Sequence, residues 1–123
     1  MGKMIAIRWL DKPEHHDYAS ARSFLTLLFK KSDAAKIVRK LEDAKMTEFK
    51  AKDIFRASKL SLLGVSNTHV EKDKRKIESG KALSPLLLVR DSKNASVIIA
   101  DGYHRLCAVY SFDEDAIVRC KIA

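Results

Sequence analysis

Apolar and polar positions alternate differently along the N-terminal part of the chain and predict two kinds of element there. Residues 4–10 are apolar and β-branched, which is typical of a short strand, and Pro13 then marks a polar loop. Over residues 19–30 the apolar positions recur with the spacing of one helical face. This spacing predicts a helix whose buried residues are Phe24, Leu27 and Leu28.

Two further helices are expected before the middle of the chain. The first covers residues 32–44 and can be capped by Ser32 or Asp33. Thr47 begins a capping motif for the second, which is short and covers residues 50–58. The inward positions of these two helices are predicted to be Ile37, Val38, Leu41, Ile54 and Phe55.

A polar helix is predicted between two glycines in the middle of the chain. Gly64 is expected to end the LSLLG segment that precedes this helix. The helix begins at Asn67 and Thr68 and stops at Gly80, which has the position of a C-terminal cap. Its inward positions are Val70 and Ile77.

Three apolar runs in the C-terminal part predict a small mixed sheet. The expected strands cover residues 86–90, 96–100 and 116–122. A polar Asp-Ser-Lys-Asn turn separates the first two, which must form an antiparallel hairpin, whereas a helix before the third leaves room for a crossover. The sequence therefore predicts an α+β fold in one domain, residues 1–123, with a mainly helical extension over residues 1–63 and a compact unit over residues 64–123.

Composition agrees with a small single-domain protein. A length of 123 residues with 46% hydrophobic content suits one core. The longest apolar runs are far shorter than the roughly 20 residues of a membrane helix, and the N-terminus lacks a signal-peptide pattern, so we expect a cytoplasmic protein. Cys107 and Cys120 lie in apolar stretches without metal-ligand spacing, so we expect buried reduced thiols and predict no metal site.

The net charge of +8 is concentrated in the middle of the chain. Residues 30–59 include ten basic and five acidic side chains, whereas residues 100–123 include three and four. Such helices can attract nucleic acid, although mixed charges are more typical of a solvated surface. A nucleic-acid-binding or nuclease module is therefore an alternative hypothesis. Phe24, Leu28 and Phe29 suit either a core or the interface of a homodimer.

The stretch VIIADGYHRLCAVY, residues 97–110, carries the strongest chemical signal. A helix that opens just after Gly102 directs unpaired N–H groups, and the positive end of its dipole, at whatever lies in front of it. Gly102 also removes the side chain that would block a phosphate, and His104 and Arg105 add directed donors. The stretch predicts an anion site.

Asp101 allows more than one interpretation. Because it stands at the junction of strand and helix, we expect it to cap the helix, which is the commoner role of Asp at such a position. The alternatives are an ion pair with Arg105 and a metal ion held beside a nucleotide.

Residues 64–123 resemble the ParB/sulfiredoxin superfamily. The resemblance is carried by Gly80 and by the segments SPLLLVRD, SVIIADGYHR and LCAVY. Members share a helix, a Gly-ended turn, a Pro-Leu-type strand and a Gly-x-His-Arg or Gly-x-Arg-Arg loop. They include partition proteins that bind and hydrolyse CTP, sulfiredoxins that use ATP, and an archaeal free-serine kinase. The resemblance implies a ParB/sulfiredoxin-like fold and a nucleotide-binding protein, with ATP or CTP and Mg²⁺ as its ligands.

The resemblance also implies a set of site residues. Gly102, His104 and Arg105 are the expected phosphate contacts, and the helix over residues 68–79 borders the base or ribose. A small kinase or NTPase of this kind would use Asp101, His104 and Arg105 as catalytic residues.

Three lesser candidates lie on the predicted helix over residues 68–79. Lys72 and Lys76 share one helical face and are further candidates for ligand contact, with two solvated lysines as the alternative. Glu71 is an alternative to Asp101 as base or metal ligand.

The chain departs from two branches of the superfamily. Sulfiredoxins carry their catalytic cysteine directly before His-Arg, where this chain has Tyr103, and Cys107 lies a helical turn further on, which argues against the sulfiredoxin reaction. The DNA-reading and dimerisation domains of partition proteins are absent from the sequence, so we do not expect a complete ParB protein. A non-catalytic regulatory partner protein that keeps the pocket as a sensor is the third hypothesis.

Overall fold

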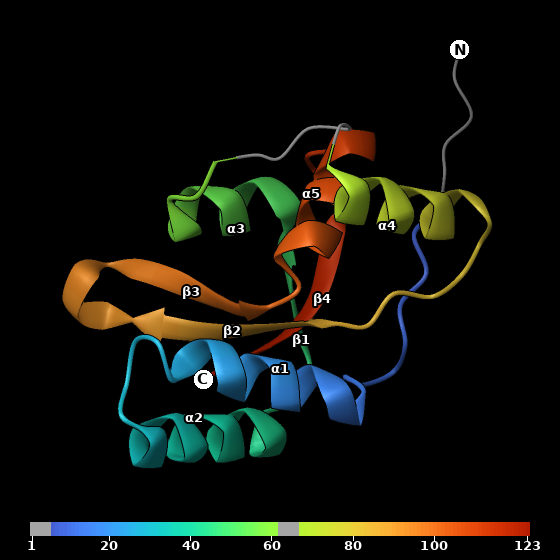
Figure 1. The fold of residues 1–123 in the computed structure, drawn as a ribbon. Helices are drawn as coiled ribbons and strands as arrows, with labels where there is room; N and C mark the ends of the chain where they lie inside the picture. Colours follow the sequence, from blue (N-terminus) through green and yellow to red (C-terminus); the bar gives the residue numbers. More distant parts are fainter. Residues whose placement is uncertain (1–5, 62–66) are drawn as a thin grey trace.

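The computed structural model describes residues 6–61 and 67–123, and within these residues one mixed sheet lies between two layers of helices. Helices α1 and α2 cover one face of the sheet, and α3, α4 and α5 cover the other (Figure 1). In chain order the elements are α1 (His15–Leu25), α2 (Lys31–Asp43), β1 (Thr47–Lys50), α3 (Ala51–Ser58), α4 (Thr68–Glu78), β2 (Leu86–Asp91), η1 (Ser92–Asn94), β3 (Ser96–Asp101), α5 (Tyr103–Phe112) and β4 (Ile117–Ile122).

The sheet has the strand order β1-β4-β2-β3. β2 and β3 form an antiparallel hairpin, and α5 carries the chain across to β4, which pairs parallel with β2. β1 then pairs antiparallel with β4 at the opposite edge. The predicted α+β class, hairpin, crossover and mixed sheet are therefore confirmed.

Each face of the sheet has its own apolar core. Leu86 and Leu88 of β2 pack with residues of α3, α4 and α5, whereas Leu87 and Val89 pack with α1 and α2. This alternation follows from the two-residue period of a strand. Because β2 is covered on both faces and paired at both edges, its first four residues are all buried and read as a continuous apolar run.

The strand predicted over residues 4–10 is wrong where it can be checked. Residues 4 and 5 lie outside the described part of the chain, and among residues 6–10 Trp9 alone forms an isolated bridge, with Leu83. The partner segment cannot extend this pairing far, because Pro85 follows closely and has no N–H to donate.

The first helix begins earlier than predicted and buries a different face. Helix α1 starts at His15 because the side chains of Glu14 and Asp17 cap its N-terminus reciprocally. Its buried residues are Asp17, Ala21 and Leu25, each four positions after the last. The predicted inward residues are instead exposed, Phe24 by 41%, Leu27 by 81% and Leu28 by 52%. Phe29 packs partly against the core under α1 and α2.

The other N-terminal predictions are partly correct. Helix α2 matches the expected span and buries Val38 and Leu41, with Ile37 partly buried, but it starts at Lys31 after Lys30, without a side-chain cap from Ser32 or Asp33. Thr47 does not cap a helix, because residues 47–50 pair with β4 as β1. Helix α3 follows this strand directly and buries Ile54 and Phe55, as expected.

The boundaries of α4 agree with its predicted signals. Asn67 caps the helix by accepting hydrogen bonds from the N–H groups of His69 and Val70, at 3.0 and 3.2 Å. Gly80 adopts a positive φ of 77° just beyond the last turn. Val70 and Ile77 are buried, as predicted. Gly64 and most of the LSLLG segment lie outside the described residues.

Among residues 6–61 and 67–123, the helices are all too short or too polar to cross a membrane. Cys107 and Cys120 are both buried and neither forms a disulfide, in agreement with the sequence prediction.

Candidate functional site

The junction of β3 and α5 requires glycine at position 102. Gly102 has a φ of 104°, a conformation that side chains disfavour. A Cβ at this position would lie 2.7 Å from Cγ of Leu86 and 2.9 Å from Nη2 of Arg105. The chain therefore turns sharply here while passing directly over β2, and α5 begins at the next residue.

Asp101 pairs with Arg105 and does not cap the helix. Nη2 of Arg105 donates a hydrogen bond of 2.8 Å to Oδ2 of Asp101, and both side chains are largely buried, with exposures of 17% and 15%. The N-cap residue is Gly102, which has no side chain to offer. The predicted cap is wrong because α5 begins at Tyr103, which makes Gly102 the N-cap residue and leaves the Asp101 carboxylate paired with Arg105.

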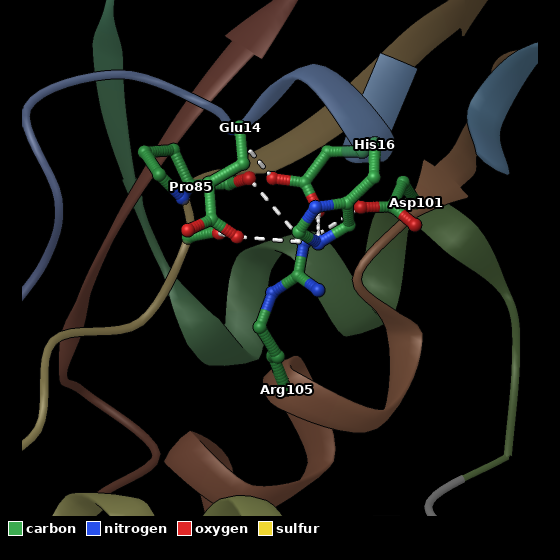
Figure 2. A network of polar contacts seen from close by, with 7 residues as sticks. Glu14, His16, Pro85, Asp101 and Arg105 are labelled. Atoms are coloured by element: carbon green, nitrogen blue, oxygen red, sulfur yellow. Dashed lines mark hydrogen bonds and ion pairs between the residues drawn. The ribbon is translucent and has the colours of Figure 1, made fainter. Parts of the chain in front are cut away.

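The side chain of Arg105 also contacts the backbone of the residue that precedes β2. Its Nη2 also approaches the carbonyl oxygen of Pro85 at 3.4 Å, while its buried Nε has no hydrogen-bond partner in the described structure. Figure 2 shows the side chain extending from α5 toward Pro85 and Asp101, with Glu14 and His16 at the far side of the cluster. The guanidinium is thus fixed in place with one donor unsatisfied.

A buried carboxylate from α1 completes this network. Asp17 is 2% exposed and accepts a hydrogen bond of 2.8 Å from the N–H of Glu14. Burial raises the pKa of Asp101, Arg105 opposes that rise, and the neighbouring Asp17 carboxyl adds to it. Two carboxyl groups therefore meet beside Arg105, one from α1 and one from the end of β3.

Glu14, His16 and Asp17 offer ligand atoms that all lie within 4.8 Å of one another. Nε2 of His16 is 3.2 Å from Oε2 of Glu14 and 3.5 Å from Oδ1 of Asp17. Reciprocal capping of α1 already accounts for the proximity of the two acids, and two of the three residues are exposed. We assign no metal to this group.

A polar pocket of about 210 Å³ opens in front of His104. Residues 101–105 form one wall of this pocket, and α4 forms the other. The α4 wall consists of His69, Lys72, Asp73 and Lys76. The structure therefore brings together Asp101, Gly102, His104, Arg105, Lys72 and Lys76, all of which the sequence indicated.

Positive charge exceeds negative charge around this pocket. Lys72, Lys76 and Arg105 face two acids, Asp73 and Asp101. Burial raises the pKa of Asp73, although the nearby Lys76, Arg105, His104 and Lys72 all favour its charged form.

His104 is biased toward its neutral form. Its ring lies 4.9 Å from the ring of His69, centroid to centroid. Burial lowers the pKa of His104 from its ordinary value of 6.5, and His69 and Arg105 lower it further against the opposing effect of Asp73. At neutral pH the imidazole can accept a proton.

Glu71 does not line the pocket. It forms an ion pair of 2.7 Å with Arg75 one turn later on an exposed face of α4, so the pocket gives no support to its predicted role as base or metal ligand. The sequence analysis missed His69 and Asp73. Their signal was the spacing of His69, Lys72, Asp73 and Lys76, which places four polar residues on one helical face.

Tyr103 contacts a segment that is distant in sequence. Its hydroxyl donates a hydrogen bond to the carbonyl oxygen of Ser61, and burial raises its pKa with a contribution from Cys107. Burial also raises the pKa of Cys120, to about 12, so this thiol stays protonated and unreactive.

Comparisons of the chain with protein-family models, with curated proteins and with solved structures found no match.

Proposed function

We propose that this protein binds the phosphoryl groups of a nucleotide in the pocket between α4 and the start of α5. The observation that carries the proposal is the convergence of Lys72, Lys76 and Arg105 on one polar hollow in front of a helix N-terminus. Phosphate oxygens accept hydrogen bonds from such donors, and the excess of positive charge favours an anion.

Backbone donors support the same ligand. The first intrahelical hydrogen bond of α5 runs from the N–H of Leu106 to the carbonyl oxygen of Gly102, at 2.9 Å. The N–H groups of Tyr103, His104 and Arg105 therefore precede the hydrogen-bonded turns and have no acceptor within the helix. Together with the glycine at 102, this geometry permits close approach of a phosphate.

The resemblance of residues 64–123 to the ParB/sulfiredoxin superfamily favours ATP or CTP as the ligand. Nucleotides bind with Mg²⁺, which needs a carboxylate oxygen, and Asp73 suits this role better than Asp101, whose carboxylate is paired with Arg105.

A small kinase or NTPase is the enzymatic form of this proposal. Phosphoryl transfer depends mainly on positioning and on stabilisation of negative charge, which the cations of the pocket would provide. His104, held toward its neutral form, would accept the proton of an attacking hydroxyl or water.

Thermal unfolding in the presence of ATP, CTP, GTP, ADP and pyrophosphate, with and without Mg²⁺, tests the proposal. A ligand that binds the folded state raises the melting temperature, and Arg105→Ala should abolish the rise. Because this variant leaves Asp101 unpaired, Arg105→Lys serves as a second variant that keeps the charge but loses the planar fork. An equal shift in wild type and both variants would disprove the assignment, as would no shift with any of the compounds.

A further inference from the structure

A second hollow lies between α3 and the sheet, and its lining is almost entirely apolar. Its volume is about 300 Å³. All four strands and α3 contribute to it, and two charged residues, Asp53 and Arg90, stand among its walls. The apolar residues are Phe49, Ile54, Ala57, Leu88, Val97 and Ile122.

The hollow exists because α3 is too short to cover its face of the sheet. The helix has eight residues and ends at Ser58, whereas the β2–β3 hairpin extends beyond its end (Figure 1). Ile54 and Leu88 are buried at 3% and 1% exposure, but Phe49 on the edge strand remains 38% exposed. Protein interiors leave few voids larger than a water molecule, and small-molecule sites start at ~300 Å³, so this space has the size of a small ligand site.

A hydrogen bond links the end of α3 to the hairpin turn. Nζ of Lys59, just beyond α3, donates a hydrogen bond of 3.2 Å to the carbonyl oxygen of Asn94 in the hairpin turn. A smaller hollow of about 220 Å³ shares Ala57, Arg90 and Val97 with the first and continues toward this turn. The end of α3 and the hairpin turn are therefore joined by a hydrogen bond beside two neighbouring hollows that share three lining residues.

The charges at the cavity leave one cation without a partner. Asp53 is neutralised by Arg56, whose Nη2 lies 2.9 Å from Oδ1 of Asp53. Arg90 lies opposite Val97 in the hairpin, on the strand face that lines the cavity, and forms no ion pair with any residue in ranges 6–61 and 67–123. The walls thus combine apolar surface with a single unbalanced guanidinium.

We propose that this cavity binds a small amphiphilic carboxylate, with its apolar tail under α3 and its carboxylate paired with Arg90. Burial of the tail releases water from apolar surface, and the planar guanidinium matches the two oxygens of a carboxylate. The site is separate from the polar pocket at α5 and shares no lining residue with it.

This site is tested by titrating the full chain with octanoate. Binding is measured by isothermal titration calorimetry and by changes in the NMR chemical shifts of Val97 and Ile122. Octanoate should bind, and 1-octanol, which has the same tail without the charge, should bind about three- to fivefold more weakly, because Arg90 is an exposed partner for the carboxylate. Arg90→Gln should weaken octanoate by a similar factor and leave 1-octanol unchanged. Lys93→Gln, an exposed charge change in the turn that does not line the cavity, is the matched control.

A second variant separates the cavity from the charge. Ala57→Leu places three more carbons in the cavity from a half-buried position and should abolish binding of both compounds, with its fold checked by circular dichroism. Octanoate binding that survives Ala57→Leu, or equal affinity for octanoate and 1-octanol, would overturn the proposal. A concentration-dependent dimer that Ala57→Leu disrupts would overturn it as well, because a second copy would then be the occupant.

Discussion

The polar pocket at α5 and the apolar cavity under α3 open on the same side of one sheet, yet they offer a ligand opposite conditions. In the pocket most charges already have neighbours of opposite sign, as Arg105 has in Asp101. In the cavity Arg90 lies beside apolar walls and forms no ion pair within the part of the chain that the structure describes. A ligand of the pocket must compete with internal ion pairs, whereas a ligand of the cavity mainly displaces water. The balance of charges should therefore determine which ligands bind in the polar pocket, whereas the shape of the apolar walls should determine which ligands bind in the cavity.

Gly102→Ala should have the largest effect, because it affects the backbone that builds the polar pocket. Positive φ and the overlap of a new Cβ with Leu86 should together lower the free energy of unfolding by about 3 kcal/mol. Gly80→Ala is the matched control: its φ is also positive but its Cβ would meet nothing within 4 Å, so strain alone should cost about 1 kcal/mol. Urea unfolding measures both, and equal losses would contradict the packing argument.

Lys72→Gln combined with Lys76→Gln should separate the two sites. Loss of two cations from the wall of the pocket should weaken pyrophosphate binding by about tenfold, while octanoate binding stays unchanged. The double variant Lys81→Gln/Lys93→Gln removes the same charge from exposed positions outside the pocket. Calorimetric titrations of both double variants make the comparison, and equal weakening would show a general effect of net charge.

Asp73→Asn should strengthen the polar site. Removing one negative charge from the pocket should tighten pyrophosphate binding by about three- to fivefold in the absence of Mg²⁺. Burial raises the pKa of Asp73 in the folded protein above the ordinary value of 3.8. The protonated carboxyl therefore contributes fully to the free energy of unfolding below pH 3.8, and this contribution is lost as the pH rises through the raised pKa. The variant should therefore gain stability over wild type at pH 7 and lose that advantage at pH 3, as measured by urea unfolding. Weaker pyrophosphate binding would mean that Asp73 helps to hold the ligand.

His104→Gln should change only the pH dependence of the polar site. The pKa of His104 lies below 6.5, so pyrophosphate affinity should rise as the pH falls through that pKa and the imidazole becomes a cation. The variant should flatten this rise between pH 7 and pH 5. His69, Asp73 and Arg105 also face this ring, so His69→Gln is titrated in parallel to separate the two imidazoles. An unchanged profile in His104→Gln would exclude this residue as the titrating group.

Local signals account for the accuracy of the sequence analysis in the C-terminal half. The span of α4 follows from the Asn67 cap and Gly80, and the hairpin follows from two apolar runs around a polar turn. Gly102 was likewise predictable, since a glycine between strand and helix has a specific conformational reason. In each case the residues that decide the structure lie within a few positions of the element itself.

The N-terminal errors arise where distant contacts override local pattern. Helix α1 packs on β3 and ends at Leu25, so Asp17 is buried beside Asp101 at the end of β3, whereas Leu27 and Leu28 lie beyond the helix and face solvent. The residues of β1 form a strand because β4 pairs with them, not because TEFK has a strand pattern. The same limit applied to the site: His69 and Asp73 become relevant only once α4 lies beside α5.

The central place of β4 has a consequence for how the chain folds. β4 is the last strand in the sequence, yet it lies between β1 and β2 in the sheet. The four-stranded sheet is therefore incomplete until residues 117–122 have paired with both neighbours. Pairings over such long sequence separations slow folding relative to a helical bundle of the same size. Until then β2 presents one apolar edge from Leu86 to Val89 that nothing pairs, a surface on which nascent chains can aggregate. The yield of folded protein should therefore depend on how quickly the final strand inserts.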